Sequence, residues 1–211
     1  MKSAIATTLV SLAAAADDKI KVELYYESQC PACRDTIVNS FKHAYAAEGF
    51  TDMAEVTFIP YGNASEKQVG SSWTYQCQHG ETECQFNYIE SCGISLITDP
   101  VNQFNFIECI EESDNSRAAG QDYDTIVDGC AEVAKSTAQA AAIKACRTSS
   151  TGNSLEHAMA VKTAALSPAH TYVPWIVAGG VHNDDVQNQI QGSLLSYVCG
   201  KYTGPNKSAD C

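Results

Sequence analysis

The sequence predicts an α/β fold, in which a central sheet flanked by helices is interrupted by a disulfide-rich, mostly helical insertion. Three observations lead to this prediction. Residues 20–60 alternate between a strand pattern, a helix pattern and a second strand pattern. Residues 63–150 hold six of the ten cysteines and few strand signals, and residues 151–211 return to helices and strands. We therefore expect one domain built from residues 17–62 and 151–211, with residues 63–150 inserted into it.

Residues 1–16 have the pattern of a secretory signal peptide. Lys2 gives a positive start, Ile5 to Leu12 form an apolar segment, and Ala14 to Ala16 offer a small-residue cleavage site. The apolar segment is too short to span a bilayer, and no other stretch approaches that length. We expect a soluble protein of the secretory pathway that has no membrane partner.

The first strand and the first helix flank the motif Cys30-Pro31-Ala32-Cys33. β-Branched and aromatic residues at Val22–Tyr26 predict the strand, and apolar residues then recur at helical spacing towards Gly49, which we expect to cap the helix. Pro31 suits a first helical turn, which can spare an N–H. Free amides at a helix start stabilise a thiolate, and only the thiolate attacks a disulfide. The motif thus indicates thiol–disulfide exchange, with a structural disulfide or half a zinc site as the alternative.

A second strand pattern at Met53–Pro60 completes a strand–helix–strand unit, which implies parallel neighbouring strands. From Ser65 to Ser150 the chain is acidic and cysteine-rich. Apolar residues recur at helical spacing around Cys109 and again from Tyr123 through an alanine-rich run to Cys146. We expect helices here that are held by disulfides rather than by a core of their own.

The last segment predicts a helix, two strands and a helix. Ser154 can cap a helix that runs to about Leu166, Tyr172–Val177 forms a strand pattern, and Gly179-Gly180 turn the chain into a short strand at Val181. Asp184 or Asp185 can cap the final helix. With a CxxC motif after the first strand, this order of elements is that of a thioredoxin-like fold with an insertion in its middle.

Val173 and Pro174 are candidate substrate-binding residues. In thioredoxin-like folds the strand opposite the CxxC motif begins with a cis-proline, and the residue before it offers backbone hydrogen bonds to the substrate. We expect Pro174 to be that proline and Val173 to be the preceding residue. A trans proline at a strand start is the alternative.

The composition indicates an acidic protein of an oxidising or endolysosomal compartment. Thirteen Lys and Arg against 25 Asp and Glu give a net charge of −12, which disfavours binding to nucleic acid and to anionic membranes. Ten cysteines are unusual for a reducing cytosol. Sequons at Asn63 and Asn206 predict glycosylation. We expect the protein in the secretory pathway, in lysosomes or endosomes or outside the cell.

Residues 77–92, CQHGETECQFNYIESC, closely resemble the signature of the gamma-interferon-inducible lysosomal thiol reductase (GILT) family. The CxxC motif lies upstream and Tyr172–Trp175 downstream, as in that family, and the resemblance covers about residues 20–211. It implies a thioredoxin-like fold with a helical insertion. It also implies reduction of protein disulfides at acidic pH in endolysosomes.

We assign Cys30 as the nucleophile and Cys33 as the thiol that resolves the mixed disulfide. An ordinary thiol, with a pKa near ~8.5, would be about one part in 10,000 thiolate near pH 4.5. We therefore expect the helix start to lower the pKa of Cys30 to roughly 4–5. His79 and His170 are more readily explained as structural residues than as catalytic ones. Trp73 and Trp175 are expected to pack.

The remaining eight cysteines are expected to form structural disulfides: Cys77, Cys84, Cys92, Cys109, Cys130, Cys146, Cys199 and Cys211. Because eight cysteines allow many pairings, only Cys199 with Cys211 is paired from the sequence. No metal site is expected. Zinc binding by Cys30, Cys33, Cys77 and Cys84 is disfavoured by the six-residue spacer between the latter two.

No cofactor is expected, although turnover needs an external small-molecule thiol as reductant. The expected partners are disulfide-bonded, unfolded protein substrates. Two other functions remain open. One is a disulfide-stabilised secreted binding module in which the Cys30–Cys33 pair is only structural. The other is an oxidase or isomerase of the same fold, because the sequence does not fix a redox potential.

Overall fold

The computed structural model describes residues 19–113 and 122–211, so the expected signal peptide at residues 1–16 lies outside the described residues. No helix within these two ranges is long and apolar enough to cross a bilayer. The elements run in chain order as β1 Ile20–Tyr26, α1 Pro31–Asp35, the π-helix η1 Thr36–Phe41, α2 Lys42–Ala46, α3 Phe50–Met53, β2 Ala54–Pro60, β3 Ser65–Val69, β4 Ser72–Gln76, α4 Glu81–Leu96, α5 Pro100–Glu112, α6 Tyr123–Val133, α7 Thr137–Arg147, α8 Ser150–Ala164, β5 Trp175–Ala178 and α9 Asp184–Lys201.

The central sheet has three strands in the order β2-β1-β5. β1 pairs with β2 in parallel, with Leu24 opposite Phe58, and with β5 in antiparallel, with Leu24 opposite Ile176. The parallel strand–helix–strand unit expected from the sequence is therefore confirmed. The short strand expected at Val181 amounts to one isolated bridge to Ala178.

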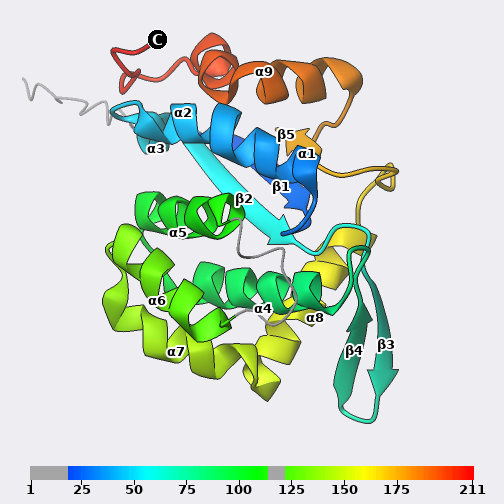
Figure 1. Cartoon of the computed structure of the whole chain (residues 1–211). Helices are drawn as coiled ribbons and strands as arrows, with labels where there is room; N and C mark the ends of the chain where they lie inside the picture. The colour runs from blue at the N-terminus through cyan, green and yellow to red at the C-terminus, as the bar shows by residue number, and fades with distance from the viewer. Residues whose placement is uncertain (1–18, 114–121) are drawn as a thin grey trace, which may run out of the picture.

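Helices cover both faces of the central sheet (Figure 1). On one face, Leu24 packs with Phe41 of η1 and Ile190 of α9 in one apolar cluster. On the other face, Tyr25 packs with Met159 of α8. The alternation of side chains along β1 places successive residues in the two clusters, so both sides of this strand are buried.

The helices α4 to α7 share an apolar core of their own, which corrects the expectation that disulfides alone would hold them. Phe86 and Ile89 of α4, Phe106 of α5 and Ile143 of α7 are fully buried in this cluster. Cys92 and Cys130 lie in the same cluster, so the bridges reinforce a packed interior.

All ten cysteines lie in the described ranges, and eight of them form four disulfides: Cys77–Cys84, Cys92–Cys146, Cys109–Cys130 and Cys199–Cys211. The pairing of Cys199 with Cys211 is confirmed, and it pins the C-terminal segment to α9. The Cys77–Cys84 bridge contradicts the zinc alternative, because a disulfide cannot supply the two thiolates that site would need.

β3 and β4 form an antiparallel hairpin, which was not expected from the sequence. Figure 1 shows the hairpin at one side of the molecule, and it contacts α8, where Trp73 of β4 stacks on His157. Its strands carry many polar residues and bury neither face fully, so the alternation that marks a half-buried strand is weak. Gly70, with φ of 63°, makes the turn.

Several helix boundaries differ from the expectation. The first helix ends at Ala46, and Gly49, with φ of 77°, precedes α3 instead of capping the helix before it. Lys135, with φ of 52°, separates α6 from α7, which were expected as one helix. Ser149 caps α8 instead of Ser154, and Asn183 caps α9 by accepting a hydrogen bond from a backbone N–H.

Candidate active site

Cys30 and Cys33 are the two cysteines outside the disulfides, and they lie where β1 gives way to α1. Cys30 is the extended N-cap residue of α1, and Pro31 fills the first helical position as expected. Cys30 is 8% exposed, whereas Cys33, one turn further on, is fully buried. Cys30 is therefore the more accessible of the two residues.

The two thiols have opposite acidities. A hydrogen bond from Cys33 lowers the pKa of Cys30 to about 6 against the effect of burial, with help from the backbone amides of Cys33 and Ala32 and the charge of His79. Burial raises the pKa of Cys33, and the neighbouring Cys30 raises it further. The hydrogen bond from Cys33 and the amides of the helix start thus favour one thiolate at Cys30, although its pKa lies above the range of 4–5 that we expected.

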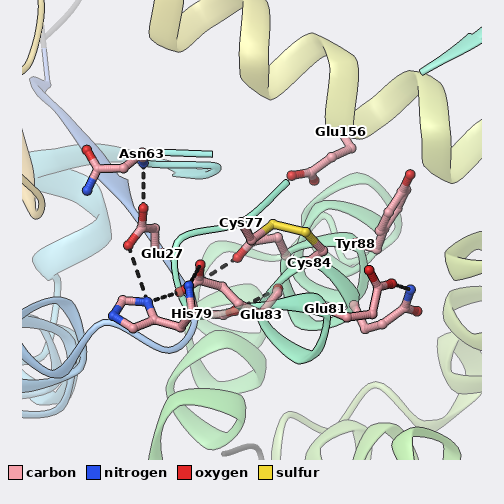
Figure 2. Close-up of a disulfide and its surroundings, with 12 residues drawn as sticks. Glu27, Asn63, Cys77, His79, Glu81, Glu83, Cys84, Tyr88 and Glu156 are labelled. Carbon is pink, nitrogen blue, oxygen red and sulfur yellow. Dashed lines mark hydrogen bonds and ion pairs between the residues drawn. A yellow bond between two sulfur atoms is a disulfide. The ribbon is translucent and has the colours of Figure 1, made fainter. Parts of the chain in front are cut away.

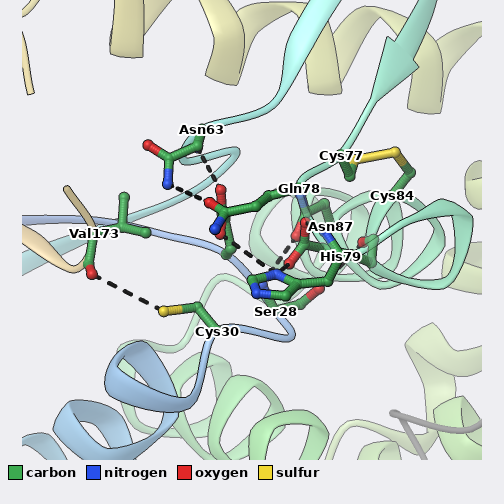
Figure 3. A network of polar contacts seen from close by, with 11 residues as sticks. Ser28, Cys30, Asn63, Cys77, Gln78, His79, Cys84, Asn87 and Val173 are labelled. Atoms are coloured by element: carbon green, nitrogen blue, oxygen red, sulfur yellow. Dashed lines mark hydrogen bonds and ion pairs between the residues drawn. A yellow bond between two sulfur atoms is a disulfide. The ribbon is translucent and has the colours of Figure 1, made fainter. Parts of the chain in front are cut away.

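The Val173–Pro174 peptide bond is cis, as the sequence analysis expected. Figure 3 shows the Cys30 thiol facing the carbonyl oxygen of Val173, and the sulfur–oxygen distance is 4.0 Å. The structure therefore brings together three of the expected site residues from opposite ends of the chain.

The loop that carries Cys30 is fixed by residues of the 77–92 segment. Ser28 donates its backbone N–H to Oδ1 of Asn87 at 3.1 Å and its hydroxyl to the carbonyl oxygen of Glu83 at 3.1 Å. Asn87 and Glu83 are fully buried in α4, and the Cys77–Cys84 bridge closes the loop before this helix. The segment thus holds the backbone two residues before the reactive thiol.

Three titratable side chains form a cluster (Figure 2): Glu27, His79 and Glu83. His79 Nδ1 lies 2.5 Å from Glu83 Oε2 and 3.7 Å from Glu27 Oε2. Burial, and next the charge of Glu83, raise the pKa of Glu27 to about 7. Burial lowers the pKa of His79, but its bond to Glu83 and the two carboxylate charges outweigh burial and raise it overall.

Sequence reasoning missed Glu27, Glu83 and Asn87 as site residues. The last two belong to the 77–92 segment that carries the family resemblance, and their role could have been sought there. Glu27 lies three residues before Cys30, but nothing local in the sequence shows that Glu27 meets a histidine 52 positions away in the chain.

The other aromatic and histidine candidates lie where packing explains them. Trp73 stacks on His157 at 4.0 Å between ring centroids, and the buried Trp175 stacks on His182. Burial lowers the pKa of His170, against a bond with the backbone of Gly62.

The two sequon asparagines, Asn63 and Asn206, are both exposed. The side-chain nitrogen of Asn63 donates to Oε1 of Gln78 at 2.6 Å, so this site lies beside the 77–92 segment (Figure 3). Both positions stay predictions of glycosylation.

A pair of free cysteines at a strand-to-helix junction, with one thiol acidic and slightly accessible and the other fully buried, defines the class of thiol–disulfide oxidoreductases. Comparison with known proteins identifies the family. The family profile described as "Gamma interferon inducible lysosomal thiol reductase (GILT)" matches residues 21–134, and the chain belongs to this family.

Three curated relatives are similar over most of their length. The gamma-interferon-inducible lysosomal thiol reductase of Carassius auratus is 36% identical over 190 residues, which cover 90% of this chain and 71% of the relative. The protein of the same name from Mus musculus is 34% identical, with 91% and 71% covered. The gamma-interferon-responsive lysosomal thiol protein of Arabidopsis thaliana is 32% identical, with 92% and 76% covered.

Proposed function

We propose that this protein reduces disulfide bonds of unfolded proteins through the Cys30–Cys33 dithiol. The Cys30 thiolate attacks one sulfur of the substrate disulfide, that bond breaks, and the leaving sulfur takes up a proton. Cys33 then loses its proton and attacks the Cys30 sulfur of the mixed disulfide. The second substrate thiol leaves, Cys30–Cys33 becomes oxidised, and an external small-molecule thiol returns two electrons.

The opposite acidities of the two thiols carry this proposal. The more acidic and more accessible thiol, Cys30, is suited to form the mixed disulfide, and the fully buried Cys33 one turn away is suited to resolve it. The carbonyl of Val173 faces Cys30 across the cis peptide at Pro174, so an extended substrate segment can bind these two residues through its backbone. This arrangement supports a thioredoxin-like domain of residues 17–62 and 151–211, with residues 63–150 as its insertion.

We place this reaction at acidic pH in the endolysosomal pathway, because the relatives in fish and mouse are named lysosomal thiol reductases. A pKa of about 6 leaves roughly one tenth of Cys30 as thiolate at pH 5. An ordinary thiol, with a pKa of ~8.5, would be ionised about three hundredfold less at that pH. The lowered pKa therefore keeps the nucleophile available in acid, although its thiolate fraction falls as the pH drops below 6.

A pH–rate profile on a denatured, disulfide-bonded protein tests the proposal, with Cys30→Ser beside the unaltered chain. We expect measurable reduction at pH 4–5 that rises towards a plateau above about pH 6, and none with Cys30→Ser. Full activity of Cys30→Ser would overturn the assigned role. Activity confined to oxidising conditions would favour the oxidase or isomerase alternative.

A further inference from the structure

Two fully buried carboxylates, Glu27 and Glu83, share a single cationic partner, His79. Burying an ionised carboxylate is costly unless it is paired, and one imidazolium supplies at most one positive charge for the two acids. The three ligand atoms, one from each side chain, lie within 4.8 Å of one another. Within the described ranges, no other group of three His, Cys, Asp or Glu residues meets this geometry.

Backbone amides fix the orientation of both carboxylates. Glu27 Oε1 accepts a hydrogen bond from the backbone N–H of Asn63 at 2.5 Å, and Glu83 Oε1 accepts one from the backbone N–H of His79 at 3.0 Å. The remaining oxygen of each acid, Oε2, faces His79 Nδ1 (Figure 2). In metal sites, the ligand atoms that do not bind the metal are typically held by hydrogen bonds of this kind.

Glu27 supplies a second, independent observation. Its Oε2 is buried and has no hydrogen-bond partner in the described residues, and at 3.7 Å from His79 Nδ1 it lies beyond hydrogen-bonding distance. Gly62, with φ of 56°, allows this close approach, because a Cβ there would overlap the Glu27 side chain. A buried carboxylate oxygen that accepts no hydrogen bond and lies near an imidazole nitrogen and a second carboxylate indicates room for a cation.

From this geometry we propose that Glu27, His79 and Glu83 bind one Zn²⁺, with water as the fourth ligand. One imidazole nitrogen and two carboxylate oxygens are a donor set that zinc accepts, with bonds of about 2.0–2.2 Å and thus about 3.3–3.6 Å between tetrahedral ligands. The His79–Glu27 separation is close to that range. His79 and Glu83, now hydrogen-bonded, must part by roughly 1 Å as zinc replaces the proton between them. The site would join the loop before Cys30 to the 77–92 segment, and it revises our expectation of no metal.

Titration of the oxidised protein with Zn²⁺, followed by calorimetry at about pH 7.5, tests the site, because oxidation removes Cys30 and Cys33 as competing ligands. We expect one equivalent to bind saturably. Glu27→Gln, which keeps the size of the side chain, and His79→Ala should each weaken binding by about tenfold or more. His157→Ala is the matched control: His157 Nδ1 lies 2.9 Å from Glu66 Oε2 but has no second carboxylate in a three-residue cluster. This variant should bind Zn²⁺ as the unaltered chain does.

A second measurement needs no variant. Co²⁺ added to the oxidised, unaltered protein should give the visible absorption of a tetrahedral nitrogen–oxygen site, and Zn²⁺ should abolish it. Absence of saturable Zn²⁺ binding, or equal weakening by His157→Ala, would overturn the site. Neither result would bear on the reductase activity, which is measured separately without added metal.

Discussion

At the scale of single residues, the acidity of the Cys30 thiol depends on the neighbouring Cys33 more than on the helix start. The hydrogen bond from Cys33 is the largest influence that lowers the pKa of Cys30, ahead of the backbone amides of Cys33 and Ala32. Since Cys33 is fully buried, its thiol stays protonated and remains a donor over the working pH range. The two cysteines thus act as a unit before any substrate arrives.

Substitution of Cys33 should therefore change the acidity of Cys30. We expect Cys33→Ala to move the inflection of iodoacetamide alkylation at Cys30 from about pH 6 towards the ordinary value of 9, because the donor is lost. Cys33→Ser keeps a donor hydroxyl and should shift the inflection less. Both variants should accumulate mixed disulfides with substrate. An unchanged inflection in Cys33→Ala would show that the helix start alone sets the acidity.

Residues with a local signal could be predicted from the sequence, and residues that meet across the chain could not. Cys30, Cys33 and Pro174 stand in recognisable patterns, a CxxC motif at a strand-to-helix change and a proline at a strand start. Glu27 and Asn87 carry no such pattern. Their roles follow from contacts with residues 52 and 59 positions away, His79 and Ser28 respectively, which only the folded chain reveals.

At the scale of elements, the start of α4 is the support of the active-site loop. The side chain of Asn87 accepts a hydrogen bond from the Ser28 N–H, and the backbone carbonyl of Glu83 accepts one from the Ser28 hydroxyl. The Cys77–Cys84 bridge fixes the turn before the helix. Residues 77–92, which carry the family signature, therefore stabilise the loop before Cys30 and do not include Cys30 itself.

Asn87→Ala should test this support. The change leaves the buried N–H of Ser28 without its acceptor, which costs about 1–3 kcal/mol of unfolding free energy. We expect a lower denaturant midpoint and a lower kcat. Asn39→Ala is the control, because the exposed side chain of Asn39 in η1 donates to Asp35, the last residue of α1, and its loss should change stability by less than about 0.5 kcal/mol. Equal effects of the two variants would contradict the supporting role of α4.

Element types were predicted well where the pattern was strong, and boundaries were not. The alanine-rich run from α6 to α7 keeps its helical spacing, so nothing in the pattern marks the break at Lys135. The hairpin β3–β4 was not predicted because both of its faces stay partly exposed to solvent. At α8 and α9 several polar residues compete as caps, and tertiary packing decides which one is used.

At the scale of the whole molecule, the folded chain buries glutamate side chains in its interior. Glu90 of α4 and Glu156 of α8 are almost fully buried, and Ser91 donates to Glu156 Oε2 at 2.8 Å. Burial raises the pKa of both carboxyls to about 8. In the folded protein both groups are therefore neutral in acid, which suits the acidic compartment that we propose for this protein.

Stability should consequently fall as the pH rises. Unfolded glutamates ionise near pH 4.5, whereas the folded ones hold their protons to about pH 8, so the stabilisation is full below 4.5 and is lost between 4.5 and 8. Each group contributes a slope of up to roughly 1.4 kcal/mol per pH unit across that window. Urea unfolding at a series of pH values measures the slope. Glu156→Gln, which cannot ionise, should flatten it, whereas Glu55→Gln at an exposed position should not. A protein that gains stability from pH 5 to pH 8 would show that these acids are ionised inside the fold.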